Sequence, residues 1–216
     1  LLNGMHGDVP SHPQCFTQLH TGSFQFVRPS LGAWVLYGLG TQNRDLPGFI
    51  TIKPPTRVGG AQNYGSAFLP AVYQGTPIGQ LGGNLKESKL SNLRNPELSK
   101  KDQRQQIDLL QSMNKDLRDR RPNNEQLEGV IESYELAFRM QGAVPEVMDL
   151  SGEPRHIQDL YGLGTPRTDD FGRQCLLARR FAESGVRFIE LTHANWDQHN
   201  GLKSKLASNC GAVDQP

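Results

Sequence analysis

The sequence predicts an α/β protein built on mainly parallel strands, and two helix–strand units separated by a helical pair indicate this class. Residues 30–39 have apolar side chains at helical spacing, and a short apolar strand follows at 49–53. Later in the chain, residues 171–184 form a helix that Gly185 ends directly before the strand 186–191. Such short helix–strand connections are typical of doubly wound sheets.

Two amphipathic helices, at 97–121 and 124–141, are expected to form an antiparallel hairpin between these units. Ser99 suits the N-cap of the first helix, and Asp102 stands at the N3 position of a capping box. Apolar side chains recur at helical spacing along both helices. We expect the charged side chains on their outer faces to contact water.

The other segments carry little periodicity. Residues 1–29 are predicted to be loop, and residues 54–96, rich in Gly, Pro, Asn and Gln, are expected to form a long functional loop or lid. The chain begins with Leu1 rather than Met, and it ends at Pro216, soon after the helical stretch at 202–210 and without a polar tail. We therefore expect residues 1–216 to be an internal fragment of a single domain.

The composition argues against several functional classes. Because 23 Lys and Arg face 22 Asp and Glu, the formal net charge of +1 argues against binding nucleic acid through a basic surface. The sequence contains no run of about 18 apolar residues and so predicts no membrane span. Three cysteines without a C-x-x-C pair argue against a disulfide framework and a zinc ribbon. Neither a phosphate-binding P-loop nor a G-x-S-x-G elbow is present.

One group of candidate ligands follows the strand 186–191, where α/β sheets bind their ligands. It contains His193, Asp197 and His199. A carboxylate with an imidazole suits zinc, manganese or iron better than calcium, and further ligands must come from elsewhere in the chain. The alternative is that Asp197 caps the following helix and His199 is a surface residue.

A second group lies near the N-terminus. Asp8 or Ser11 could act as a nucleophile beside a metal ion, and His6 or His12 could bind that metal or a phosphate. The alternative is a polar loop in contact with water. Arg28 stands at the start of the helix 30–39, where it could bind an anion or form a surface salt bridge.

Several long segments, in order, resemble the bacterial family called domain of unknown function 1501, which is sulfatase-like and belongs to the alkaline phosphatase superfamily. The resemblance runs from about residue 5 to the end. The segments that carry it are MHGDVPSH at 5–12, RPSLGAWVLYGLGT at 28–41, LPGFI at 46–50, FLPAVYQGT at 68–76, QIDLL at 106–110, YELAFRMQ at 134–141 and WDQH at 196–199.

The resemblance implies a partial alkaline-phosphatase-like α/β/α sandwich with the helical hairpin inserted, and hydrolysis of a small anionic sulfate or phosphate ester. The cofactor would be a divalent metal (zinc, manganese or calcium), usually at a two-metal site. Asp197 and His199 match the metal ligands in the middle of the superfamily's chains. Residues 8–12 lie where related phosphodiesterases have their nucleophile loop, with Asp8 in the place of a Thr and Ser11 in the place of a frequent Asn.

The remaining candidates would bind substrate or support the metal ligands: His6, His12, His193 and Arg28. In family members the chain continues on both sides of this region, so residues 1–216 alone are expected to be inactive and of low stability. Members often carry export signals, which implies an exported or periplasmic protein. The alternative function is a non-catalytic exported binding module that uses residues 54–96.

Overall fold

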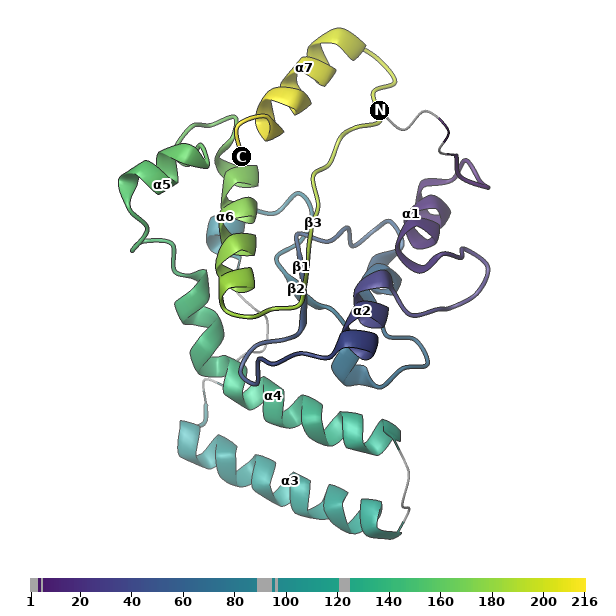
Figure 1. Ribbon diagram of the computed structural model, residues 1–216, viewed down its shortest axis with the longest axis vertical. Coiled ribbons are helices and arrows are strands. Elements are labelled where there is room, and N and C mark those ends of the chain that lie inside the picture. Colours follow the sequence, from purple (N-terminus) through teal and green to yellow (C-terminus); the bar gives the residue numbers. More distant parts are fainter. Residues whose placement is uncertain (1–3, 5, 89–94, 96, 121–124) are drawn as a thin grey trace.

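The computed structural model describes residue 4 and residues 6–88, 95, 97–120 and 125–216. Its centre is a sheet of three parallel strands, β1 (Phe49–Ile52), β2 (Thr76–Ile78) and β3 (Phe188–Leu191), in the order β2-β1-β3 (Figure 1). The described residues also form seven α-helices. The predicted α/β class with parallel strands is therefore confirmed.

One face of the sheet is apolar. Because side chains alternate along a strand, Ile50 and Ile52 of β1 point to the same face as Ile189 and Leu191 of β3. Two helices cover this face, α4 (Glu125–Met148) and α6 (Asp169–Glu183). They contribute to the apolar core the buried side chains of Met140, Val144, Leu177 and Phe181.

The opposite face carries Phe49, Thr51, Phe188 and Glu190. The helix α2 (Leu31–Leu39) lies against the two phenylalanines, whose rings meet at 83°. A Cβ atom on Gly32 would come within 2.6 Å of the Phe49 ring, so the lack of a side chain allows this close approach. The helix predicted at 30–39 is therefore present as α2, and the hydroxyl of Ser30 directly before it accepts a hydrogen bond from the backbone of Ala33.

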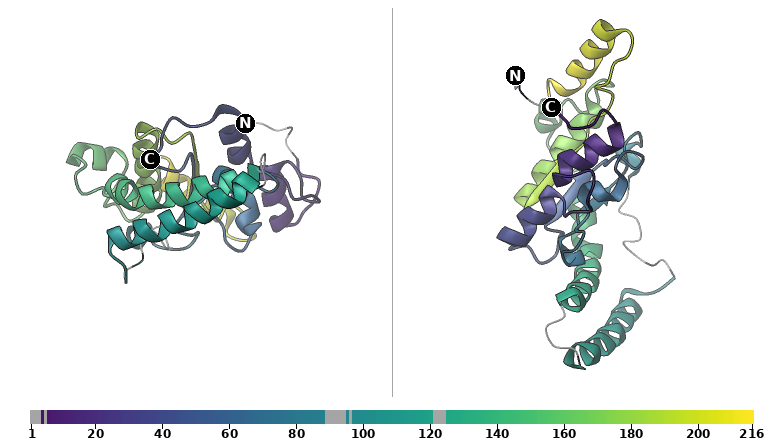
Figure 2. Two further views of the ribbon diagram at one scale, coloured as in Figure 1. Left: turned by 90° about the horizontal axis from the view of Figure 1, so that it is seen from below. Right: turned by 90° about the vertical axis from the view of Figure 1, so that its right-hand side faces the viewer.

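The helical hairpin consists of α3 (Lys100–Arg120) and α4, side by side at one end of the elongated molecule (Figures 1 and 2). Arg104 pairs with Glu135, and Arg118 pairs with Glu128, so the two helices run antiparallel as predicted. The predicted N-cap is also present, because the Ser99 hydroxyl accepts a hydrogen bond from the Asp102 amide. The turn expected at 121–124 lies outside the described residues.

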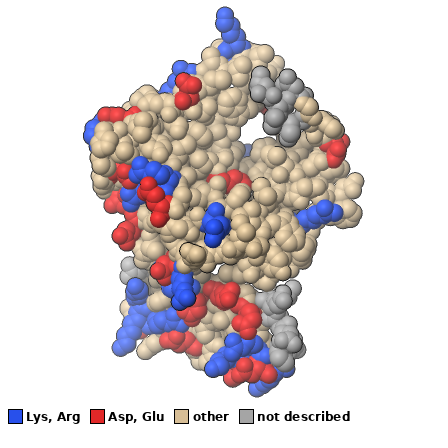
Figure 3. All heavy atoms as spheres, in the orientation of Figure 1, with Lys and Arg blue, Asp and Glu red and all other residues tan. Residues whose placement is uncertain are grey.

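The surface of the hairpin differs in one respect from the expectation. Acidic and basic side chains gather on it, as predicted (Figure 3). The apolar side chains along α3 are nevertheless largely exposed, with Leu109 at 64 % and Met113 at 62 %.

The second helix of the hairpin, α4, is longer than predicted and continues through Pro145 to Met148. Pro145 has no backbone N–H and so costs the helix one hydrogen bond. Burial of the neighbouring Val144 side chain in the core favours the helix and offsets this cost.

The prediction that residues 1–29 are loop is wrong, because the helix α1 (His12–Thr21) lies within them. Its boundary signals are in the sequence. Ser11 takes an extended conformation at the N-cap, a proline occupies the first turn, and Gly22 ends the helix with a left-handed conformation at φ 73°. The weak apolar pattern inside α1 hid these signals.

The prediction that residues 54–96 lack regular structure is wrong in part. Between short 3₁₀ turns at 60–64, 71–73 and 85–87, the strand β2 pairs with β1 and buries Ile78. Pro77 within β2 masked the strand in the sequence, and an edge strand tolerates it. Residues 89–94 and 96 lie outside the described residues.

Two further helices are present, and the second begins where the sequence has the helical stretch at 202–210. They are α5 (Arg155–Leu160) and α7 (Leu202–Val213), and α7 forms the end of the molecule opposite the hairpin (Figures 1 and 2). None of the helices in the described part of the chain combines the length and the apolar character needed to cross a membrane.

Candidate metal centre

Three side chains from the two ends of the sequence meet in one cluster. The Asp197 Oδ2 atom lies 2.9 Å from Nε2 of His12 and 2.7 Å from Nε2 of His199. The potential ligand atoms of the three residues all lie within 4.8 Å of one another. Within the described ranges, no other group of three His, Cys, Asp or Glu residues shares this property. The cluster therefore joins the two groups of candidates that the sequence predicted separately.

His12 is the first residue of α1, so the position of its imidazole depends on this helix. The segment before α1 folds back along it. The Cys15 thiol donates a hydrogen bond to the Val9 carbonyl at 2.7 Å, and the Gln18 amide contacts the Asp8 carboxylate. These contacts fix the start of α1.

Asp197 and His199 lie on the loop between β3 and α7. Asn195 turns this loop with a φ of 68°, a conformation that asparagine tolerates better than most residues. Its carbonyl accepts hydrogen bonds from the side-chain amides of Gln198, at 2.7 Å, and Asn209 in α7. The chain therefore fixes the turn directly before the two candidate ligands.

The cluster has the chemistry of an open metal site. Two imidazoles and a carboxylate are three protein ligands of the kind that bind catalytic zinc or non-haem iron, with coordination positions left for water or substrate. All three side chains are accessible to solvent, with exposed fractions of 62 %, 50 % and 82 % for His12, Asp197 and His199. A small molecule can therefore reach the cluster.

His193 lies on the same loop but outside the cluster. Its imidazole contacts the rings of Phe171 and Trp196 edge-on, and its Nδ1 atom is buried without a hydrogen-bond partner among the described residues. Burial lowers the pKa of His193; the Asp170 carboxylate opposes this effect and Lys53 adds to it. The neutral form of the ring is therefore favoured.

The two predicted nucleophiles occupy different positions. Ser11 directly precedes His12 and is exposed. Asp8 is exposed too, but its backbone and carboxylate both contact the side chain of Gln18. His6 is exposed, and neither it nor these two residues belongs to the three-residue cluster.

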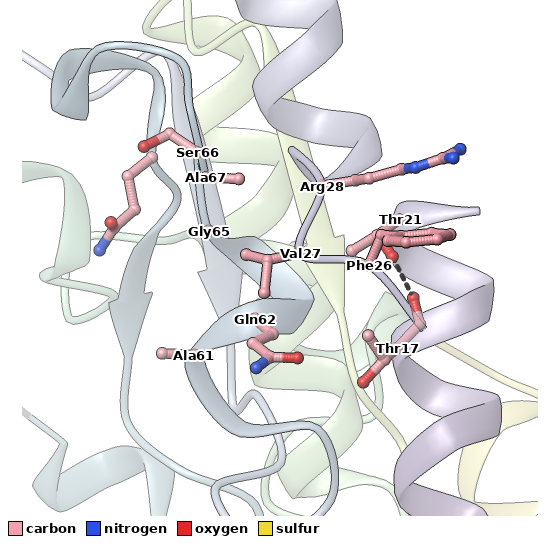
Figure 4. Close-up of a pocket in the computed structure, with 11 residues that line it drawn as sticks. Thr17, Thr21, Phe26, Val27, Arg28, Ala61, Gln62, Gly65, Ser66 and Ala67 are labelled. Atoms are coloured by element: carbon pink, nitrogen blue, oxygen red, sulfur yellow. Dashed lines mark hydrogen bonds between the residues drawn. The ribbon is translucent and has the colours of Figure 1, made fainter. Parts of the chain in front are cut away.

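Arg28 lines a cavity of about 240 Å³ between α1 and residues 61–67 (Figure 4). In this view its side chain lies beside Phe26 and points out of the cavity, and its guanidinium carbon is 5.7 Å from the centre of that ring. The three residues of the cluster do not line this cavity. The structure therefore does not bring Arg28 to the candidate metal centre.

The model of the family described as Protein of unknown function (DUF1501) matches residues 1–216. The chain belongs to the DUF1501 family. Searches of curated proteins and of solved structures gave no match. Because the family description assigns no activity, the function of this DUF1501 protein must be inferred from its geometry.

Two polar contacts of the DUF1501 protein near its sheet involve residues that no sequence motif indicated. Glu190 in β3 contacts His20 at the end of α1, with both side chains largely buried. Lys53, at the end of β1, is 5 % exposed and pairs with both carboxylate oxygens of Asp170 at 2.8 Å. The sequence does carry a signal for these contacts. Glu190 and Lys53 are charged residues in or directly after strands whose other residues are mostly apolar.

The first of these contacts changes the charge state of His20, and the second accompanies an unusual backbone conformation at Lys53. Burial opposes the charged form of His20, but hydrogen bonds to Glu190 and to the Phe16 carbonyl outweigh burial, and the pKa of His20 is raised. Lys53 takes a φ of 55°, which is uncommon outside glycine and is typical of backbone held by its surroundings.

Proposed function

We propose that the DUF1501 protein is a metal-dependent hydrolase of small sulfate or phosphate esters, on a partial alkaline-phosphatase-like α/β/α sandwich. The observation that supports this best is the convergence of His12, Asp197 and His199. Two of these residues are the metal ligands that the sequence resemblance implies. The third comes from the segment in which the resemblance implies a nucleophile.

The donor set fits a divalent ion of the zinc or manganese type better than calcium, which prefers oxygen ligands. His12, Asp197 and His199 would hold this ion. When bound, the metal would polarise the oxygens of the ester and lower the pKa of the attacking group. The Nε2 atoms of both imidazoles already lie 2.9 Å and 2.7 Å from the Oδ2 atom of Asp197.

Ser11 is the better placed of the two predicted nucleophiles. It directly precedes His12, and its hydroxyl makes no capping hydrogen bond to the backbone of α1. The carboxylate of Asp8, in contrast, contacts Gln18. We therefore assign the attack on the ester to the Ser11 hydroxyl, or to a water bound beside it.

His193 would contact the substrate or support the metal ligands. Burial favours the neutral form of its ring, and the ring contacts that of Trp196, the residue directly before Asp197 on the same loop. A neutral imidazole can accept or donate a proton at neutral pH, so it suits a contact with an ester oxygen.

The test combines metal binding with turnover. Metal content and zinc affinity are measured on the 216-residue chain, and aryl-sulfate and aryl-phosphate hydrolysis on a full-length family member with the same residues. Asp197→Ala should weaken zinc binding by about 100-fold and abolish turnover, because a ligand is lost. Asp214→Ala, at the exposed aspartate directly after α7, is the matched control. Absence of bound metal, or full activity of Asp197→Ala, would contradict the proposal.

A second candidate function is binding without catalysis. The favouring observation is that residues of the 54–96 segment line two open cavities, one beside α1 and one of about 460 Å³ beside the hairpin. Turnover of neither ester by a metal-loaded protein would favour this function over hydrolysis.

A further inference from the structure

The helix α1 carries His12, but few apolar contacts hold it. All residues of α1 are described, and Thr17 is the one buried residue among them. Leu19 is 74 % exposed. Since burial of apolar side chains normally fixes a surface helix, α1 requires other contacts to keep its first residue at the cluster.

A polar contact supplies this attachment at the far end of the helix. His20 Nε2 lies 3.2 Å from Glu190 Oε1, and the exposed fractions of the two side chains are 15 % and 19 %. The Thr51 hydroxyl donates a hydrogen bond to the same Glu190 oxygen at 3.4 Å. The contact thus ties α1 to both β1 and β3.

Both nitrogens of the His20 ring face an acceptor. Nδ1 lies 2.7 Å from the Phe16 carbonyl, and Nε2 faces the Glu190 carboxylate. A neutral imidazole carries one hydrogen and cannot donate to both. With an ionised Glu190, the two contacts are therefore satisfied together by an imidazolium, and the pair is a partly buried salt bridge.

The helix α1 is linked twice to β3 and the loop that follows it. Glu190 in β3 holds His20, and Asp197, on the loop that follows β3, holds His12. The first contact is shielded from water and the second is exposed to it. The shielded contact can therefore hold the helix in place while the exposed one exchanges its partner for a ligand.

We propose that the His20–Glu190 pair is a positioning contact that holds α1 on the sheet and thereby presents His12 to Asp197 and His199. This inference rests on the proposed function where it concerns metal affinity. It assigns a role to two residues that do not themselves touch the metal, and it predicts that their effects depend on each other.

The first experiment is a double-mutant cycle on zinc affinity. His20→Asn removes the atom that contacts Glu190, and Glu190→Gln keeps the shape of the side chain while removing its charge. Each variant should weaken zinc binding by about 10-fold, and the double variant should be no weaker than either one, because both break one contact. His156→Asn, at an exposed histidine of α5, should change nothing. Wild-type affinity in both single variants, or additive losses, would overturn the proposal.

A second readout needs no metal and separates this inference from the proposed function. Nitrogen-15 spectra of the wild-type imidazoles should show both His20 nitrogens protonated at pH 6, and Glu190→Gln should remove that signature. Amide hydrogen exchange should rise within 12–21 in the variants and stay unchanged in α6. If the wild type binds no zinc but shows these changes, the proposed function fails and the positioning role of the pair stands. A neutral His20, or unchanged exchange in α1, would refute that role.

Discussion

The two faces of the sheet are held by different chemistry. On the face toward α4 and α6, the strands present isoleucine and leucine to a buried apolar core. On the other face, Thr51 and Glu190 stand among the phenylalanines and meet His20. The apolar face holds the fold together, whereas the polar face positions the helix that carries His12. The comparison teaches that a thinly packed helix can be placed accurately by a few specific polar contacts.

The largest loss of stability is expected when a side chain of the apolar core is removed. Phe181 is fully buried in the apolar cluster, so Phe181→Ala should lower the free energy of unfolding by about 4 kcal/mol through lost burial and a cavity. Leu19→Ala, on the exposed side of α1, should cost less than about 0.5 kcal/mol. Urea unfolding measures both. Comparable losses for the two variants would show that α1 is packed as firmly as the core.

A smaller loss of stability is expected when Glu153 is changed. This residue precedes α5 and pairs with two arginines of α6. Its side chain is 7 % exposed and receives Arg180 at 2.7 Å and Arg179 at 2.9 Å. The Arg180 hydrogen bond lowers the pKa of Glu153; burial opposes this effect and Arg179 adds to it. Glu153→Gln should cost about 3 kcal/mol at neutral pH, because two guanidinium groups lose their carboxylate.

The pH dependence of this loss has a definite sign. The folded pKa of Glu153 lies below the ordinary value of 4.5, so its contribution is present above that pH and disappears as the pH falls through the folded value. The difference between wild type and Glu153→Gln should therefore shrink in acid. Glu183→Gln removes an acid that is 64 % exposed beside the same Arg179, and it should change stability little. An equal loss in the two variants would contradict the importance of burial.

The same contrast explains which features the sequence could reveal. The short apolar strand at 49–53 and the amphipathic helix before β3 predict the apolar core, because burial leaves apolar runs and periodic patterns in the sequence. Asp197 and His199 could be predicted as a pair because they are neighbours in sequence. Their approach to His12 could not, because nearly the whole chain separates them and the helix that carries His12 has almost no apolar pattern.

The polar face was hidden for a related reason. An acid at Glu190 within an apolar strand normally indicates a side that faces water, and nothing in the local sequence shows that His20 covers it. The contact becomes visible only when the pairing of β1 with β3 and the path of α1 are known. Long-range polar pairs of this kind leave no periodic signal.

The smallest predicted effect concerns pH and the attachment of α1. Because the folded pKa of His20 is raised, the stabilisation from its charge is fully present below the ordinary value of about 6.5 and is lost as the pH rises through the folded value. Glu190 is the acid that faces the ring. The local opening free energy of α1 should fall by about 1 kcal/mol above that window.

Amide hydrogen exchange of residues 12–21, corrected for the intrinsic effect of pH, measures this change, and the buried amides of α6 provide the internal reference. Glu190→Gln should flatten the pH dependence of α1 while leaving that of α6 as it is, because the variant removes the charge that His20 faces. If α1 opens with the same pH dependence in both proteins, the two faces of the sheet do not differ in the way proposed. In that case, packing against residues 60–64, rather than the ion pair, would hold His12 in place.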